Sequence, residues 1–88
     1  MNQLASKMVI VDDEPIILRS LKVAVPWEKI GVKIVGQARN AEEALQLIEK
    51  HRPQMVISDI RMPAMDGISL MRKVMKQYPD TVFILLSG

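Results

Sequence analysis

The hydrophobic residues of the chain fall into short continuous runs that alternate with segments of helical spacing. Four apolar runs bounded by turn residues lie at 7–11, 32–38, 54–59 and 81–86. Runs of this length are typical of short buried strands, although the second run shows partial alternation. Near-continuous apolar strands favour a sheet that is covered on both faces.

Three segments between these runs, 15–25, 41–52 and 67–78, have apolar residues at helical spacing. Pro15 suits the first turn of a helix, where its missing N–H costs little. Asn40, followed by Glu43 three residues later, predicts a capping box, and Asp66 is a suitable N-cap. The expected core-facing residues are Ile17, Leu21 and Ala24 or Val25 in the first helix, Ala41, Ala44, Leu45 and Ile48 in the second, and Ile68, Met71, Val74 or Met75 and Tyr78 in the third.

The resulting order of elements is β-α-β-α-β-α-β. This alternation predicts an α/β fold in which a parallel sheet is connected by right-handed crossover helices. The chain has 88 residues, no internal repeat and no linker-like segment, so we expect one domain over 1–88.

Composition excludes several classes of protein. The chain has no cysteine, which excludes disulfides and thiolate metal sites and favours a cytoplasmic location. The apolar runs are much shorter than the roughly 20 residues of a membrane span, and no signal peptide is evident. The net charge is only +2 and the basic residues are scattered, so we do not expect the chain itself to bind nucleic acid.

Two of the predicted strands end in carboxylates. Asp12 and Asp13 follow the first run, and Asp59 ends the third. The carboxyl ends of parallel strands lie at the same edge of a sheet, so the three side chains converge if these strands are neighbours. Mg²⁺ would relieve the repulsion between the carboxylates and leave positions for phosphate oxygens. Asp59 is then the natural nucleophile, because carboxylates form acyl phosphates.

Simpler roles for these acids are also open. Asp13 or Glu14 could cap the helix that begins at Pro15, and Asp59 alone could be a turn residue. The agreement of strand length, acid position and following proline at both places favours a site.

Three segments in this order, 9–15 (VIVDDEP), 57–67 (ISDIRMPAMDG) and 84–88 (ILLSG), resemble the receiver domain of bacterial two-component response regulators. The resemblance extends from about residue 7 to the last residue. The segments 25–31 (VPWEKIG) and 35–38 (VGQA) are similar to receivers fused to AraC-type helix-turn-helix regulators. The resemblance implies a flavodoxin-like (CheY-like) fold whose parallel sheet has the strand order 2-1-3-4.

The resemblance also implies roles for particular residues. Asp59 would accept a phosphoryl group from a sensor histidine kinase. Asp12, Asp13 and Asp59, with the backbone carbonyl of Arg61, would bind Mg²⁺, and Ser87 would be the switch hydroxyl that turns toward the phosphoryl group. The implied function is regulatory and not enzymatic: the added charge would control an output, expected to be transcription. DNA would be contacted only by an output domain that is absent from this chain.

The chain departs from the family pattern after the fourth apolar run. Full receivers continue with a helix, a fifth strand that carries a lysine, and a last helix, so we expect a truncated receiver. The fourth strand would then be an exposed apolar edge that favours self-association. Because the family's lysine has no counterpart in this chain, a non-phosphorylated interaction module is one alternative. Another is a hydrolase of the haloacid-dehalogenase type, but that class needs a second acid where Arg61 stands.

Overall fold

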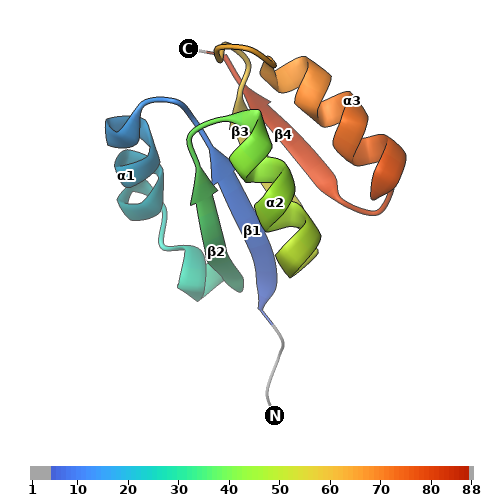
Figure 1. The fold of residues 1–88 in the computed structure, drawn as a ribbon. Coiled ribbons are helices and arrows are strands. Elements are labelled where there is room, and N and C mark those ends of the chain that lie inside the picture. Colours follow the sequence, from blue (N-terminus) through green and yellow to red (C-terminus); the bar gives the residue numbers. More distant parts are fainter. Residues whose placement is uncertain (1–4, 88) are drawn as a thin grey trace.

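The computed structural model describes residues 5–87, in which a four-stranded parallel sheet carries helices on both faces (Figure 1). The elements are β1 (Ser6–Val11), α1 (Pro15–Ala24), the 3₁₀ helix η1 (Trp27–Ile30), β2 (Val32–Ala38), α2 (Ala41–His51), β3 (Met55–Asp59), α3 (Gly67–Gln77) and β4 (Val82–Leu86). The strand order is β2-β1-β3-β4, which confirms the predicted order. Residues 1–4 and Gly88, which ends the third family motif, lie outside the described range.

Two apolar clusters hold the helices to the sheet. On one face, α2 and α3 pack against side chains of the central strands. This cluster includes Val9 and Val56 of the strands and Ile48 and Leu70 of the helices. On the other face, α1 contributes Leu18 to a smaller cluster with residues of β1, β2 and β3. The middle residues of the central strands β1 and β3 are buried, which explains why these sequences are almost continuously apolar.

The helix starts form as the sequence predicts. The Asn40 side chain accepts the N–H of Glu43 at 2.8 Å, and the Glu43 carboxylate accepts the N–H of Arg39 at 2.8 Å. Asp66 accepts the N–H of Ser69 at 2.7 Å at the start of α3. The Asn40 and Asp66 bonds satisfy N–H groups in the first turns of α2 and α3, and the Glu43 bond ties the chain before the N-cap to the helix. These bonds set where α2 and α3 begin.

The predicted core faces are right for α2 but partly wrong for α1 and α3. Leu18 and Leu70 are buried, whereas Ile17 and Ile68 are 36% and 37% exposed. Both helices have so many apolar residues that two different faces of each helix show apolar residues at helical spacing. Tertiary contacts decide between the rotations: in α3, the close approach of Gly67 to the backbone of β3 turns Leu70 inward.

Strand β4 lies at one edge of the described sheet and exposes apolar side chains. Val82, Ile84 and Leu86 are 56%, 39% and 37% exposed. Their register partners Met55, Ile57 and Asp59 show that these side chains project from the face on which α1 lies. Helix α1 packs on that face through Leu18, and it lies on the β2 side of the sheet, away from β4 (Figure 1). An apolar stripe along β4 therefore remains open to solvent.

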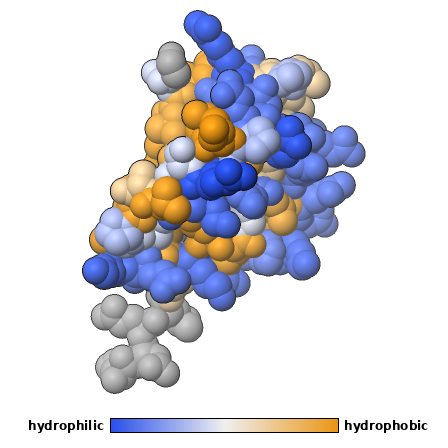
Figure 2. Space-filling model, turned by 90° about the vertical axis from the view of Figure 1, so that its left-hand side faces the viewer, coloured by the Kyte–Doolittle hydropathy of each residue, from blue (hydrophilic) through white to orange (hydrophobic). Residues whose placement is uncertain are grey.

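The side of the molecule formed by α1 and β2 also carries exposed apolar side chains. Ile16 and Val23 of α1 are 65% and 79% exposed, and Ile30 of η1 is 60% exposed. Figure 2 shows this side, where hydrophobic surface lies between hydrophilic patches. Each helix within residues 5–87 is too short or too polar to cross a lipid bilayer.

Candidate functional site

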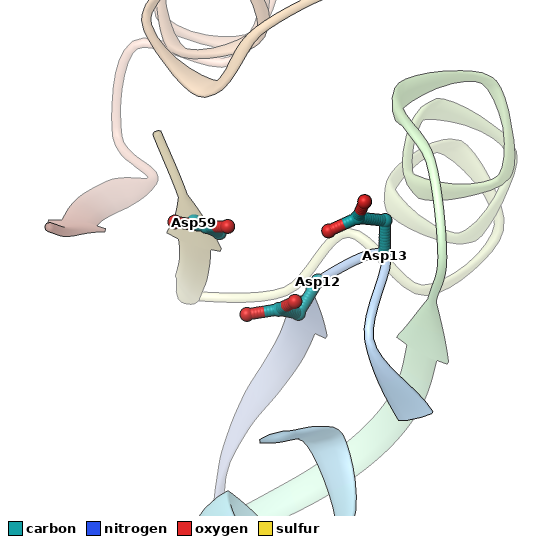
Figure 3. A group of neighbouring side chains, drawn as sticks. All are labelled: Asp12, Asp13 and Asp59. Carbon is teal, nitrogen blue, oxygen red and sulfur yellow. The ribbon is translucent and has the colours of Figure 1, made fainter. Parts of the chain in front are cut away.

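Three carboxylates meet at the carboxyl ends of β1 and β3. The two strands are parallel neighbours, with Val11 opposite Ser58, so the residues that follow them lie side by side. Asp12, Asp13 and Asp59 each place a carboxylate oxygen within 4.8 Å of the others. Figure 3 shows the three side chains around a common space. The predicted convergence of these acids is confirmed.

Burial and charge make this cluster electrostatically unfavourable. Asp12 is buried, and Asp13 and Asp59 are partly buried. Burial is the main cause of a raised Asp12 pKa; the N–H of Glu14 opposes the rise, and the charges of Asp59 and Asp13 add to it. Such a cluster favours a bound divalent cation, because the cation offsets both desolvation and repulsion.

One of the simpler roles, in which the side chain of Glu14 caps α1, does not hold. Glu14 occupies the N-cap position, but its side chain makes no capping hydrogen bond. Its backbone N–H instead donates to Asp12 Oδ1 at 2.9 Å. Pro15, which follows, needs no partner for a backbone N–H. Asp12 therefore orients the start of α1 while remaining part of the carboxylate cluster.

The backbone after Asp59 is held by two hydrogen bonds. The N–H of Ile60 donates to the carbonyl of Leu86 at 3.2 Å, and the N–H of Gly67 donates to the carbonyl of Ile60 at 2.8 Å. A Cβ at position 67 would collide with the carbonyl oxygen of Asp59 and would lie 3.0 Å from the Cα of Ile60. Glycine thus lets α3 begin directly against the strand end that carries Asp59.

Ser87 and Arg61 stand at the same edge of the sheet. Ser87 is exposed and follows Leu86, the register partner of Asp59. Arg61 is exposed two residues after Asp59 and, with Asp66, lines a shallow pocket of the β3–α3 loop. The close cluster consists of the three aspartates, and the roles of Ser87 and the Arg61 carbonyl stay predictions.

Two residues that sequence reasoning did not select also shape the site. Gly67 is the first residue of α3, and glycine is a poor helix former. A glycine at this place in the sequence could therefore have indicated a close approach of backbone. Ser58 is completely buried next to the apolar residues of β3, and its hydroxyl donates to the carbonyl of Asp59 at 2.9 Å. Both act on the Asp59 backbone and neither belongs to the cluster.

Ala64, in the loop between Asp59 and α3, has a left-handed backbone with φ of 68°. This conformation costs an L-residue about 1 kcal/mol or more, whereas glycine adopts it freely. Ala64→Gly is therefore expected to stabilise the fold by about 0.5 kcal/mol, after the added unfolded-state entropy of glycine is subtracted. Urea unfolding measures the change.

Arg52→Gly is the control, because Arg52 also has a positive φ of 47°. It should gain less or lose stability, since Arg52 donates to the Glu49 carbonyl and stacks over Tyr78. Destabilisation by Ala64→Gly would show that the loop conformation is not strained.

Comparison with known proteins gives consistent matches. The family model described as the response regulator receiver domain matches residues 8–88. The transcriptional regulatory protein YesN of Bacillus subtilis is 42% identical over 82 residues, which cover 93% of this chain and 22% of YesN.

Two solved structures are similar along almost the whole chain. The receiver domain of AraT, a response regulator from Geobacillus stearothermophilus, superposes with a TM-score of 0.91 at 33% identity and covers 97% of this chain. A two-component AraC transcriptional regulator from Clostridium phytofermentans superposes with a TM-score of 0.89 at 36% identity, over 96% of this chain. The chain spans 66% and 65% of these structures.

Proposed function

Because the chain belongs to the response regulator receiver family, we propose that Asp59 is a phospho-acceptor whose modification regulates an output. The observation that carries this role is the convergence of three carboxylates within 4.8 Å, with Asp59 at the end of β3. Mg²⁺-dependent phosphorylation by acetyl phosphate, abolished by Asp59→Asn, is the test.

The transfer is a substitution at phosphorus. A carboxylate oxygen of Asp59 forms a bond to the phosphorus of a phosphohistidine, and the P–N bond breaks. The bonding electron pair stays on the imidazole nitrogen, and the product on this chain is an acyl phosphate. Such transfer depends mainly on positioning and on neutralising charge. The hydrogen bonds of Ile60 and Gly67 hold the strand end from which Asp59 acts.

The donor set fits a hard divalent cation. Asp12, Asp13 and Asp59 would hold Mg²⁺, and the Arg61 carbonyl would be a further ligand. Bound there, the cation would supply positive charge for the carboxylates and the phosphoryl oxygens. The raised pKa of Asp12 supports this fit, because burial beside two other acids disfavours its charged form.

Family membership supports a proposal for the partners of this chain. The phosphoryl donor is a sensor histidine kinase, and Ser87 supplies the hydroxyl that responds to the phosphoryl group. Relatives of this chain are named as transcriptional regulatory proteins, so the regulated output is transcription through a DNA-binding domain outside this chain. The receiver itself is a regulatory domain and not an enzyme.

Asp12→Asn should raise the melting temperature of the metal-free chain at neutral pH. Because folding raises the pKa of Asp12 above its ordinary value of 3.8, the protonated side chain stabilises the fold below pH 3.8. This stabilisation is lost as the pH rises through the raised pKa. The advantage of the variant should therefore shrink as the pH falls toward 3.8. Mg²⁺ should stabilise the parent chain and leave Asp12→Asn almost unchanged, as thermal unfolding would record.

Asp80→Asn removes the same charge from an exposed position outside the cluster. It should neither stabilise the metal-free chain nor reduce the response to Mg²⁺. Equal effects of the two variants would show that net charge, and not the cluster, sets the stability.

We also infer that the 88-residue chain self-associates through β4. Val82, Ile84 and Leu86 form an exposed apolar stripe on a strand that pairs only with β3 in the described sheet. The Val82 N–H donates to the Gln54 carbonyl, and the Leu86 carbonyl accepts the N–H of Ile60. Alternate residues of a parallel ladder face opposite neighbours, so the backbone groups of Phe83 point away from β3. A second copy can cover both the stripe and these groups.

Ile84→Lys is expected to shift the chain toward monomer, because a charge on the stripe opposes its burial. Sedimentation velocity at micromolar concentrations, with and without the substitution, measures this shift. Ile16→Lys places the same charge on an exposed apolar position of α1 and should have no effect. A parent chain that sediments as a monomer throughout would contradict self-association.

A further inference from the structure

A cleft of about 630 Å³ lies between the end of α1, the 3₁₀ helix η1 and the beginning of β2. It is distinct from the carboxylate cluster, because β2 begins at Val32 and reaches the cluster's edge of the sheet only at Ala38. Asp12 donates its backbone N–H to the carbonyl of Ala38 at that far end. The cleft is therefore near the amino ends of the strands.

The apolar part of the cleft is preformed. The indole Nε1–H of Trp27 donates to the carbonyl of Leu21 at 2.7 Å, which fixes the ring against the end of α1. Val32 is buried and Ile34 partly buried on the sheet side, and both belong to the cluster under α1. Gly31, with φ of 81°, turns the chain between η1 and β2. The floor thus needs no rearrangement to accept an apolar group.

The charged residues that line the cleft are mostly basic. Three lysines line it, Lys22 from α1, Lys29 from η1 and Lys33 from β2, against one acid, Glu28. The whole chain has a nearly even balance of 12 basic and 10 acidic residues. An apolar floor with a rim of lysines is complementary to a ligand that has an apolar anchor between carboxylates.

Strand β2 adds a feature that distinguishes a peptide from other anions. In the described sheet β2 pairs only with β1, so one side of its backbone faces away from the sheet. The Gly31 carbonyl accepts the N–H of Ser6 in β1, so in a parallel ladder the backbone groups of the next residue, Val32, point outward. An extended peptide can use such an edge, whereas a lipid chain cannot.

We propose that this cleft binds an acidic peptide segment of a partner protein, with an aliphatic or aromatic anchor on Trp27, Val32 and Ile34. Carboxylates on either side of the anchor pair with Lys22, Lys29 and Lys33. The segment lies along the outer edge of β2. Figure 2 shows the side of the molecule that would be covered.

A titration with a defined peptide tests this binding. The probe is an acetylated, amidated peptide of alternating Asp and Glu with one Leu and one Phe and no Trp. Trp27 is the only tryptophan of the chain, so its emission reports on the cleft directly. We expect a saturable blue shift that weakens as NaCl is raised, because the lysine contacts are screened by salt.

Matched charge reversals locate the site. Lys22→Glu with Lys33→Glu should weaken binding by about tenfold or more. Lys73→Glu with Lys76→Glu makes the same change on exposed positions of α3 and should alter binding by less than about twofold. Circular dichroism of each variant checks that the fold is kept.

Several results would overturn the inference. One is no saturable change in Trp27 emission; another is equal weakening by the two pairs of reversals. Equal binding of a peptide with glycine in place of Leu and Phe would show attraction by charge alone. Binding of myristate or of phosphatidylglycerol vesicles, in place of the peptide, would identify a lipid site. Self-association that Lys22→Glu with Lys33→Glu abolishes would show that a second copy fills the cleft.

Discussion

Replacing Asp59 with asparagine is expected to lower phosphorylation by acetyl phosphate about a hundredfold or more, because the amide lacks the nucleophilic carboxylate. The substitution keeps the size of the side chain and removes one of three carboxylates that lie within 4.8 Å. The metal-free variant should therefore be at least as stable as the parent chain. Intact-mass spectrometry after incubation with acetyl phosphate and Mg²⁺ measures the modified fraction.

Asp80→Asn is the matched control and should be phosphorylated like the parent chain. An Asp59→Asn variant that is still modified would place the acceptor elsewhere. A parent chain that is never modified, with or without Mg²⁺, would favour the alternative of a non-phosphorylated interaction module. Steady turnover of a generic phosphate ester would favour the hydrolase alternative, which Arg61 at the position of the expected second acid argues against.

Gly67→Ala is expected to destabilise the fold by about 3 kcal/mol, since the added methyl group has no space. It would collide with the Asp59 carbonyl oxygen and would also lie 3.0 Å from the Cα of Ile60, in the same peptide unit. Both obstacles are backbone, so α3 or the end of β3 must move. For a domain of this size the loss corresponds to a fall in melting temperature of roughly 12–24 °C.

The same substitution should also slow phosphorylation at temperatures where the variant is folded, because the displaced backbone carries Asp59. Gly36→Ala is the control: its Cβ would lie 3.0 Å from the end of the flexible Leu47 side chain. That neighbour can move, so the expected cost is less than about 1 kcal/mol, with no change in phosphorylation. Equal losses from the two variants would contradict the positioning role of Gly67.

Most of the fold could be predicted because its local signals agree with its tertiary packing. The capping residues Asn40 and Asp66 begin α2 and α3 as expected, and the four apolar runs form the four strands. The rotation of α1 could not be predicted, since Ile17 and Leu18 both satisfy helical spacing. Contacts with strands distant in sequence bury Leu18 and leave Ile17 at the surface.

The site could be predicted in part, because its reactive side chains lie at the ends of strands that the sequence predicts. Asp12, Asp13 and Asp59 were identifiable as strand-end acids, but their convergence depends on β1 and β3 being neighbours, which follows from the whole topology. The importance of Gly67 depends on how closely α3 approaches β3. That distance is a property of packing between elements and not of spacing along the chain.

The most direct test of the central claim is to locate the acyl phosphate. The chain is incubated with acetyl phosphate and Mg²⁺ and then reduced with borohydride, which converts an aspartyl phosphate to homoserine. Peptide sequencing by mass spectrometry should find homoserine at position 59, in an amount that falls sharply when Mg²⁺ is chelated or Asp12 is replaced by asparagine. Homoserine at Asp12 or Asp13, or equal labelling without Mg²⁺, would contradict a single metal-dependent acceptor at the end of β3.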